Sequence, residues 1–380
     1  MANLNLKSMR AVPSGRIERW LGAEKAEKMS RDMRGWYGPP INIRDLPGSV
    51  WIGGDGEFVG DFQRGFFDSA MDALDRKIRM LSRRLSFDPC MAGAGFASIS
   101  AALARASAGY GQKLNGNILK TGATGVTSSA NSMWQSGSMP VAGGAASAAP
   151  GGRAPDKSTT GAMSFNNPSG SDTLHLVGAN LFGSIAGNTV LLYDRIFDVA
   201  KTMNSTTTEA VTGIPTRYQS TTGGAADSAE GNFLFIEVQT VLANTPHNWA
   251  TCLYTDQGGA TGQTLPTVFG NAAAIASRLD MSTFTWFCPL ASGDSGIAAL
   301  SQMQCSSLVA TGAINFVIGH PIAFMAFPFI PHLLQFDWLT NMDQAPRIFN
   351  DACLALLEMP KPSTVAMTLS GQISVTSAPP

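Results

Sequence analysis

The sequence predicts a mainly β protein (α+β) in which a helical N-terminal arm and a low-complexity bridge precede an antiparallel β sandwich or barrel. Three observations lead to this prediction. Charged residues are concentrated before residue 90, small residues dominate from 121 to 170, and apolar and polar residues alternate near the C-terminal end. They divide the 380 residues into an arm (1–90), a bridge (91–170) and a body (171–380).

The arm holds about half of the chain's 26 Lys and Arg and 27 Asp and Glu residues. We expect a helix over residues 66–85, because apolar side chains recur there at steps of three and four residues. Acidic residues lie in its first half and basic residues in its second, which complements the helix dipole. Its apolar stripe, together with an aromatic residue in the bridge, is our candidate subunit contact. These candidate residues are Met71, Leu74, Ile78, Leu81, Leu85 and Trp134.

The bridge is poor in side chains that could form a core. Most residues from 121 to 170 are Gly, Ala, Ser, Thr or Pro. Such a stretch buries little apolar area against the entropy lost on ordering. We therefore expect a neighbouring subunit to hold the bridge in place.

The body is expected to be β-rich, because apolar and polar residues alternate over residues 365–375. Gly-rich and Pro-rich turn clusters separate further short candidate strands, as in a sandwich or barrel. Two short helices are expected to interrupt them, over residues 272–279 and 297–308. The other expected strands are residues 173–177, 189–193, 232–240, 249–254, 284–288, 313–318 and 333–338.

Composition excludes several classes of protein. A net charge of -1 is too small for a general polyanion binder, which needs a surplus of cations. The five cysteines are widely spaced, which favours buried thiols over a disulfide framework or a zinc site. The most apolar window, residues 314–330, is short and interrupted by Gly and Pro. We expect no membrane span and synthesis in the cytoplasm.

Candidate catalytic groups do not converge in the sequence. Residues 293–296, GDSG, match the nucleophile turn of chymotrypsin-like proteases, but His175 lies in an alternating strand rather than in the family's histidine motif. Asp194 and Asp198 beside Arg195 are expected to form a locally paired polar edge. The four histidines lie far apart, and residues 319–321 are expected to form a bend between two strands. We therefore expect no enzyme activity, cofactor or metal.

Three segments of the body resemble a sequence type found in structural proteins of tailed bacteriophages. They are residues 174–203 (LHLVGANLFGSIAGNTVLLYDRIFDVAKTM), 209–218 (EAVTGIPTRY) and 312–321 (GAINFVIGHP). The resemblance implies a virion protein, a capsid or capsid-associated component, that forms a large homo-oligomeric assembly with other virion proteins. It also implies an alternative fold, the phage capsid fold with a spine helix and an extended loop.

The first functional hypothesis is therefore a self-assembling virion protein, made in the host cytoplasm and held by subunit packing and arm exchange. The basic end of the helix over 66–85 leaves genome contact through the arm as a further expectation. The second hypothesis is a tail or surface module that binds a carbohydrate through loops such as residues 256–264. The third is a hydrolase.

Overall fold

The computed structural model describes residues 96, 98–125, 128–282, 285–328, 333–338, 345–359 and 364–379. In this part of the chain the fold is mainly β, with antiparallel sheets and one short α-helix, as the sequence predicts. The helix expected over 66–85 lies outside the described residues. Contacts group Asp88–Pro380 into one unit, so the described part of the bridge belongs to the same unit as the body. Among the described helices, none has the length and apolar character needed to cross a bilayer.

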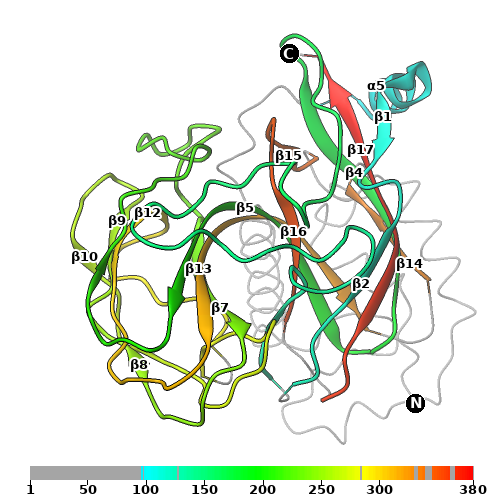
Figure 1. Ribbon diagram of the computed structural model, residues 1–380. Helices are drawn as coiled ribbons and strands as arrows, with labels where there is room; N and C mark the ends of the chain where they lie inside the picture. The colour runs from blue at the N-terminus through cyan, green and yellow to red at the C-terminus, as the bar shows by residue number, and fades with distance from the viewer. Residues whose placement is uncertain are drawn as a thin grey trace, which may run out of the picture. The chain divides into compact units, whose positions relative to one another are not determined.

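A five-stranded central sheet forms the middle of the body (Figure 1). Its two longest strands pair with each other along their whole length, with register shifts at two points. All of its pairings are antiparallel. In spatial order its strands are β3 (Asn131–Ser132), β16 (Leu354–Glu358), β5 (Asn188–Thr202), β13 (Ala313–Phe327) and β7 (Phe233–Thr240).

The central sheet closes on itself through a short irregular segment. Asn131 at one edge forms an antiparallel bridge with Arg278, and Glu237 at the other edge forms one with Leu279. The amide of Ser132 also donates to the carbonyl of Ser277 at 2.7 Å. These bridges cover part of each edge of the central sheet, which limits pairing of those edges with another chain.

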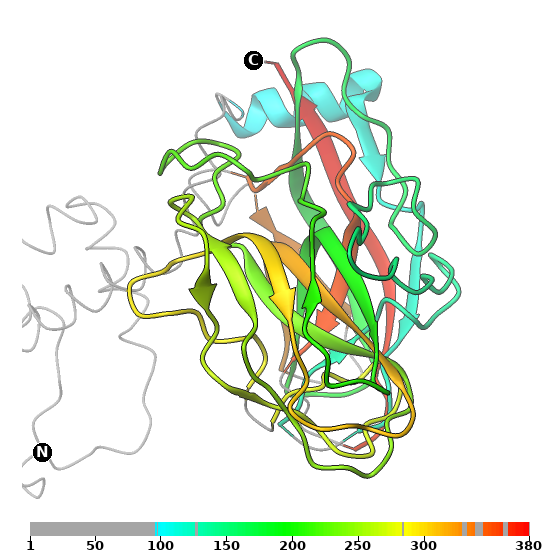
Figure 2. The ribbon, with the colours of Figure 1, turned by 60° about the vertical axis from the view of Figure 1, so that its left-hand side comes forward.

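An outer sheet of six strands covers one face of the central sheet. Its two eleven-residue strands, β4 and β17, pair with each other and lie side by side in Figure 2. The remaining strands pair with one or other of these two. The bounds are β1 (Gly111–Lys113), β2 (Ile118–Thr121), β4 (Thr173–Gly183), β14 (Leu333–Asp337), β15 (Arg347–Ile348) and β17 (Thr368–Ala378).

A smaller four-stranded sheet and a two-stranded pair share the core on the opposite face of the central sheet. They occupy the left of Figure 1. The four-stranded sheet contains β6 (Glu209–Ala210), β9 (Leu253–Asp256), β10 (Gln263–Thr264) and β12 (Ile297–Met303), and the pair is β8 (Asn248–Trp249) with β11 (Val268–Phe269).

The period-two alternation of β5 divides its apolar side chains between two cores. Leu191 and Tyr193 belong to the core shared with the small sheet, whereas Val190 and Leu192 belong to the core shared with the outer sheet. The central sheet is therefore buried on both faces, which explains its nearly continuous apolar strands. The predicted sandwich or barrel is more fully described as a closed central sheet between two packed layers.

Helix α5 (Ile99–Arg105) begins at Ser98, whose hydroxyl accepts from the amide of Ala101 at 3.1 Å. A π-helical turn, Ala106–Tyr110, follows it. The Arg105 side chain donates to the carbonyl of Ser377 at 3.2 Å, which fastens the helix to the end of β17.

Four predicted elements differ from the structure. The expected strand 249–254 is split into β8 and β9, because Thr251 has a φ of 57°. The expected helix 297–308 is instead strand β12, which pairs with β9. The expected helix 272–279 is a series of turns, with Ala273 and Ser277 at positive φ. The described part of the expected strand 284–288 contains no strand.

Candidate functional site

Strand β5 carries four charged side chains into the interior. Asp194, Arg195 and Asp198 are 0% exposed, and Lys201 is 1% exposed. The sequence predicted a locally paired polar edge here. Arg195 does pair with Asp198, but Asp194 pairs with the distant Arg217, and all three charged side chains are buried rather than at an edge. β5 continues past Tyr193 through the middle of the molecule, where burial obliges each charge to find a partner.

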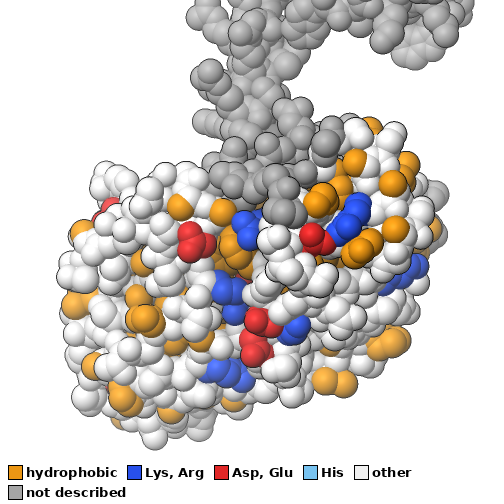
Figure 3. All heavy atoms as spheres, turned by 90° about the horizontal axis from the view of Figure 1, so that it is seen from above, with side chains coloured by type: hydrophobic (Ala, Val, Ile, Leu, Met, Phe, Trp, Pro, Cys, Tyr) orange, Lys and Arg blue, Asp and Glu red, His pale blue; other side chains and the backbone are white. Residues whose placement is uncertain are grey.

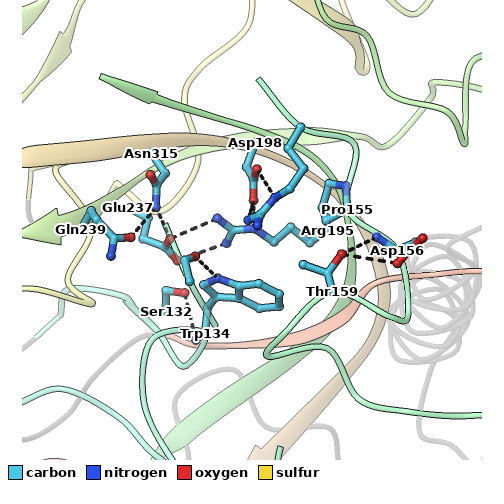
Figure 4. Close-up of polar contacts among 12 residues, drawn as sticks. Ser132, Trp134, Pro155, Asp156, Thr159, Arg195, Asp198, Glu237, Gln239 and Asn315 are labelled. Carbon is cyan, nitrogen blue, oxygen red and sulfur yellow. Dashed lines mark hydrogen bonds and ion pairs between the residues drawn. The ribbon is translucent and has the colours of Figure 1, made fainter. Parts of the chain in front are cut away.

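Arg195 is the centre of the largest ionic network (Figure 4). Its Nε donates to Asp198 Oδ2 at 2.7 Å, and its two terminal nitrogens donate to the carboxylate of Glu237 at 3.1 and 3.2 Å. The amide of Asn315 donates to Glu237 Oε1 at 2.8 Å. The network thereby joins β5, β7 and β13 through side chains as well as through the backbone ladder.

A second bidentate pair lies on the same strand. Arg217 donates to both oxygens of Asp194 at 2.8 Å and to the carbonyl of Pro155 at 2.9 Å. The amide of Cys353 also donates to Asp194, at 2.8 Å. One carboxylate of β5 therefore holds together a loop of the body, the bridge and the start of β16.

Burial and neighbouring charges keep Arg195 and Cys353 each in a single protonation state. Burial disfavours the charge on Arg195, but attraction to Glu237 and then Asp198 outweighs it and raises the pKa well above the usual value. Burial, followed by the charge of Asp194, raises the pKa of the Cys353 thiol. A guanidinium locked in its charged form and a thiol locked in its neutral form suit structural cohesion rather than proton transfer or nucleophilic attack.

The bridge is fastened to this network. The Arg153 side chain donates to both oxygens of Asp198 at 3.0 and 2.7 Å. Trp134 lies with its ring 4.7 Å from the Arg195 guanidinium carbon and donates from Nε1 to the carbonyl of Gly144 at 3.0 Å. At 1% exposure, Trp134 is covered by its own chain rather than offered to another subunit. The other five candidate contact residues lie outside the described part of the chain.

A separate buried carboxylate, Asp280, collects three donors. They are Trp249 Nε1 at 2.8 Å, His247 Nε2 at 2.9 Å and the amide of Asn271 at 2.6 Å. Burial alone would lower the pKa of His247, but the hydrogen bond and charge of Asp280 outweigh this and raise the pKa above 6.5. The opposite ring nitrogen lies 2.9 Å from the carbonyl of Thr245, so the imidazolium form can donate from both nitrogens.

Lys120 is a further buried charged residue, and its ammonium group contacts backbone carbonyl oxygens. Its side chain is 2% exposed and donates to the carbonyls of Ser136 and Val141 at 2.8 and 3.3 Å. Desolvation lowers its pKa from 10.5 to about 8. The buried ammonium group holds the 136–141 loop against β2, but its desolvation lowers the stability of the folded protein.

The hydrogen bonds of His175 and of the protease-like turn 293–296 join each to other residues. The ring nitrogens of His175 lie 2.8 Å from Thr173 Oγ1 and 2.9 Å from the carbonyl of Ala345, in the outer sheet. Asp294 accepts from the Tyr254 hydroxyl, and the amide of Ser295 donates to Gln257 Oε1 at 3.0 Å. His175 thus lies in the outer sheet, whereas residues 293–296 form a turn before β12 in the small sheet.

His320, a further candidate metal ligand in the sequence, is part of the packing of the fold. His320 lies inside β13, not at a bend between two strands, and its ring stacks on Tyr218 with 3.8 Å between centroids. Desolvation lowers its pKa to about 3, so it stays neutral. Across the described ranges, no group of three His, Cys, Asp or Glu residues is placed to hold a metal ion.

The candidate glycan loop 256–264 is the hairpin between β9 and β10. The carboxylate of Asp256 accepts from the amide of Ala260 at 2.9 Å, so it serves the turn itself. The loop contains no aromatic residue on which a sugar could stack.

Few charged side chains of the described residues are fully exposed. Within the described residues, Lys113 is the only exposed cation, and Asp227 and Asp351 are the only exposed carboxylates. The remaining described charges are buried or half-buried, many of them in the pairs above. Figure 3 shows one face on which several basic and acidic side chains lie near one another across the middle, among uncharged ones.

Sequence reasoning missed Glu237, Asp280, Arg217 and Lys120 as organising residues. A usable signal was present, because a lone charge in a long uncharged stretch of a β-rich chain is a candidate for burial with a specific partner. Asp280, flanked by runs with almost no charge, is the clearest case. The identity of each partner could not be predicted, since the partners come from distant segments.

Comparison with protein-family models gives no match, and comparison with curated proteins gives none. Among solved structures, the crystal structure of infectious bursal disease virus VP2 subviral particle aligns with 71% of this chain and 82% of that chain. The sequence identity is 10% and the TM-score is 0.15. Similarity this low carries no argument about fold or function, and the tailed-phage resemblance stays an expectation from the sequence.

Proposed function

We propose that this chain is a structural protein that assembles with copies of itself, acting by packing rather than by catalysis. The observation that carries the proposal is that, within the described residues, few charged side chains are exposed, while most of the buried charges have ionic partners. A surface without net charge offers little repulsion between copies, which favours association. A soluble enzyme or a nucleic-acid binder would be expected to carry more charge on its outside.

Exposed apolar side chains at opposite ends of the body support an extended assembly rather than a simple pair. Ile99 and Leu103 are 46% and 58% exposed on α5, at the upper right of Figure 1. Phe269, in the strand that pairs with β8 at the lower left, is 62% exposed. Contacts in different directions allow a chain to join several neighbours, as shells and tubes require.

The virion assignment is the finer part of the proposal, and it rests on the sequence resemblance to tailed-phage structural proteins. The longest resembling segment, residues 174–203, spans nearly all of β4 and the whole of β5. We propose a capsid shell or capsid-associated protein, made in the host cytoplasm and incorporated into the virion with other virion proteins. Arm exchange between copies, and genome contact through the arm, are further parts of this proposal.

Electron microscopy and light scattering of the purified full chain test the proposal. We expect large closed or tubular particles at micromolar protein, and a chain that stays monomeric over this range would contradict self-assembly. Deleting residues 1–90 tests the arm separately. We expect the shortened chain to keep its far-ultraviolet circular dichroism but to lose particles, and an unchanged size distribution would exclude the arm's role.

A further inference from the structure

Three loops meet at one end of the body, where β7 ends and β13 begins. They comprise residues 240–249, 266–273 and 304–312, which we call the tip; β8, within it, lies at the lower left of Figure 1. Phe269 pairs with Asn248 in the register of β8 and β11, and the amide of Ser306 donates to the carbonyl of Asn248 at 2.9 Å. The amide of Ala243 donates to the carbonyl of Thr311 at 3.2 Å. The loop 240–249 is therefore hydrogen-bonded to each of the other two loops.

The tip exposes one large apolar side chain from each loop. Val241 is 55% exposed, Phe269 is 62% exposed and Leu308 is 58% exposed. The three loops contain no Lys, Arg, Asp or Glu. Single exposed apolar residues are ordinary on a protein surface, but three on interconnected uncharged loops indicate a contact surface.

The tip is built on a rigid support. The buried carboxylate of Asp280 accepts hydrogen bonds from two of the loops, through Trp249 and the amide of Asn271. Gly270 packs so closely on His247 that an added Cβ would lie 2.2 Å from Nε2. Gly312, with a φ of +111°, packs equally closely on Leu242. Because the loops are already ordered, little conformational entropy remains to be lost when a partner binds.

We propose that the tip docks onto a second copy of this chain, an inference that rests on the proposed self-assembly. An uncharged apolar patch favours a partner surface without charges, because a charge buried against it would lose its hydration. The described exterior of this chain is such a surface, with Lys113, Asp227 and Asp351 as its exposed charges. A lipid surface fits less well, since loops that bind anionic membranes carry exposed cations, whereas the tip has no Lys or Arg and its His247 is buried.

The size of the patch agrees with one contact among several. The three exposed side chains offer on the order of 300 Å² per copy, whereas a stable pair buries about 800 Å² per partner. The tip alone is therefore too small to make a dimer in dilute solution. It becomes effective when other contacts already hold the copies together.

The test introduces one charge at the tip of the full chain, as Phe269→Asp or, separately, Leu308→Asp. Two controls are matched to these variants. Phe269→Leu keeps the apolar side chain, and Thr222→Asp places the same charge on an exposed position outside the tip. Particle formation is followed by light scattering against protein concentration, and melting temperature establishes that each variant is folded.

We expect both tip variants to need at least tenfold more protein to assemble, with Phe269→Leu and Thr222→Asp behaving as the wild type. Equal assembly of the tip variants and the wild type would overturn the tip's role and leave self-assembly intact. Equal impairment by Thr222→Asp would also overturn it, since net charge would then explain the effect. Wild-type binding to phosphatidylcholine vesicles that Phe269→Asp abolishes, with assembly unchanged, would assign the tip to lipid. A wild type that never assembles would contradict the proposed function itself.

Discussion

Strand β5 and the tip distribute polarity in opposite ways. β5 places Asp194, Arg195 and Asp198 in the interior at 0% exposure, whereas the tip places Val241, Phe269 and Leu308 in solvent at more than half exposure. The usual soluble protein does the reverse, with charges outside and large apolar groups inside. The difference shows that charged side chains of β5 contribute to cohesion within the chain, and it agrees with the proposal that exposed apolar side chains of the tip make contacts between chains.

The two regions also differ in what they add to stability. A buried ion pair that loses one partner leaves an uncompensated charge in a medium of low polarity. Replacing an exposed apolar side chain changes only how the surface is hydrated. Substitutions of the buried charges should therefore lower the free energy of unfolding, whereas substitutions at the tip should change assembly with little effect on it. The variants below run from the largest expected effect on the free energy of unfolding to the smallest.

The largest effect is expected for Arg195→Met. Glu237 would keep only the amide of Asn315 as a donor among the described residues, so we expect a loss of about 3 to 5 kcal/mol in the free energy of unfolding. Urea unfolding at pH 7 measures it, with the exposed Lys113→Met as control at less than about 0.5 kcal/mol. A loss below about 1 kcal/mol for Arg195→Met would show that the network contributes little to cohesion.

Lys120→Met should change the pH dependence of stability. Lys120 has a folded pKa of about 8 against 10.5 when unfolded, so the wild type should gain stability as pH rises from 8 to 10.5. The gain is up to about 3 kcal/mol, the free-energy equivalent of this pKa difference. Urea unfolding of the wild type and of Lys120→Met from pH 8 to 10.5 measures this gain in stability. Parallel curves for wild type and variant would mean that the ammonium is not desolvated.

His247→Gln should have a smaller effect with the opposite pH dependence. The folded pKa of His247 is raised, so its contribution is fully present below the unfolded pKa of 6.5 and is lost as pH rises through the folded value. We expect the variant to be less stable by about 1 to 2 kcal/mol at pH 5.5, with the gap narrowing at higher pH. A gap that is constant from pH 5.5 to 9 would argue against an imidazolium paired with Asp280.

The smallest effect on folding is expected at the tip. Phe269→Asp replaces a side chain that is 62% exposed, so the free energy of unfolding should change by less than about 0.5 kcal/mol. Urea unfolding of the unassembled protein measures it. A loss of 2 kcal/mol or more would place Phe269 in the fold's own packing and weaken its assignment as a contact residue.

The sequence allowed the β class and most of the strands to be predicted, because alternation and turn residues are local signals. The extent of β5 could not be predicted in the same way. Its charged residues after Tyr193 indicated an edge, since the partners Glu237, Arg153 and Arg217 lie far away in sequence. β12 was mistaken for a helix because its short apolar run, IAALSQM, is compatible with either period.

The candidate site was less predictable than the fold. Burial of Trp134 depends on Arg195 and Gly144, and nothing in the local sequence of the bridge indicates that contact. The low total charge favoured self-association, which stays a prediction. It could not reveal which charges of the described body are buried with specific partners, because burial is a property of the three-dimensional arrangement.

The central claim is that uncharged apolar surfaces drive assembly of this chain. Light scattering of the full chain from 0.05 to 1 M NaCl, at protein concentrations that span the onset of assembly, tests it most directly. Contacts between apolar surfaces are not screened by salt, so we expect the onset concentration to stay constant or to fall. An onset that rises severalfold with salt would contradict the claim and assign assembly to charged contacts.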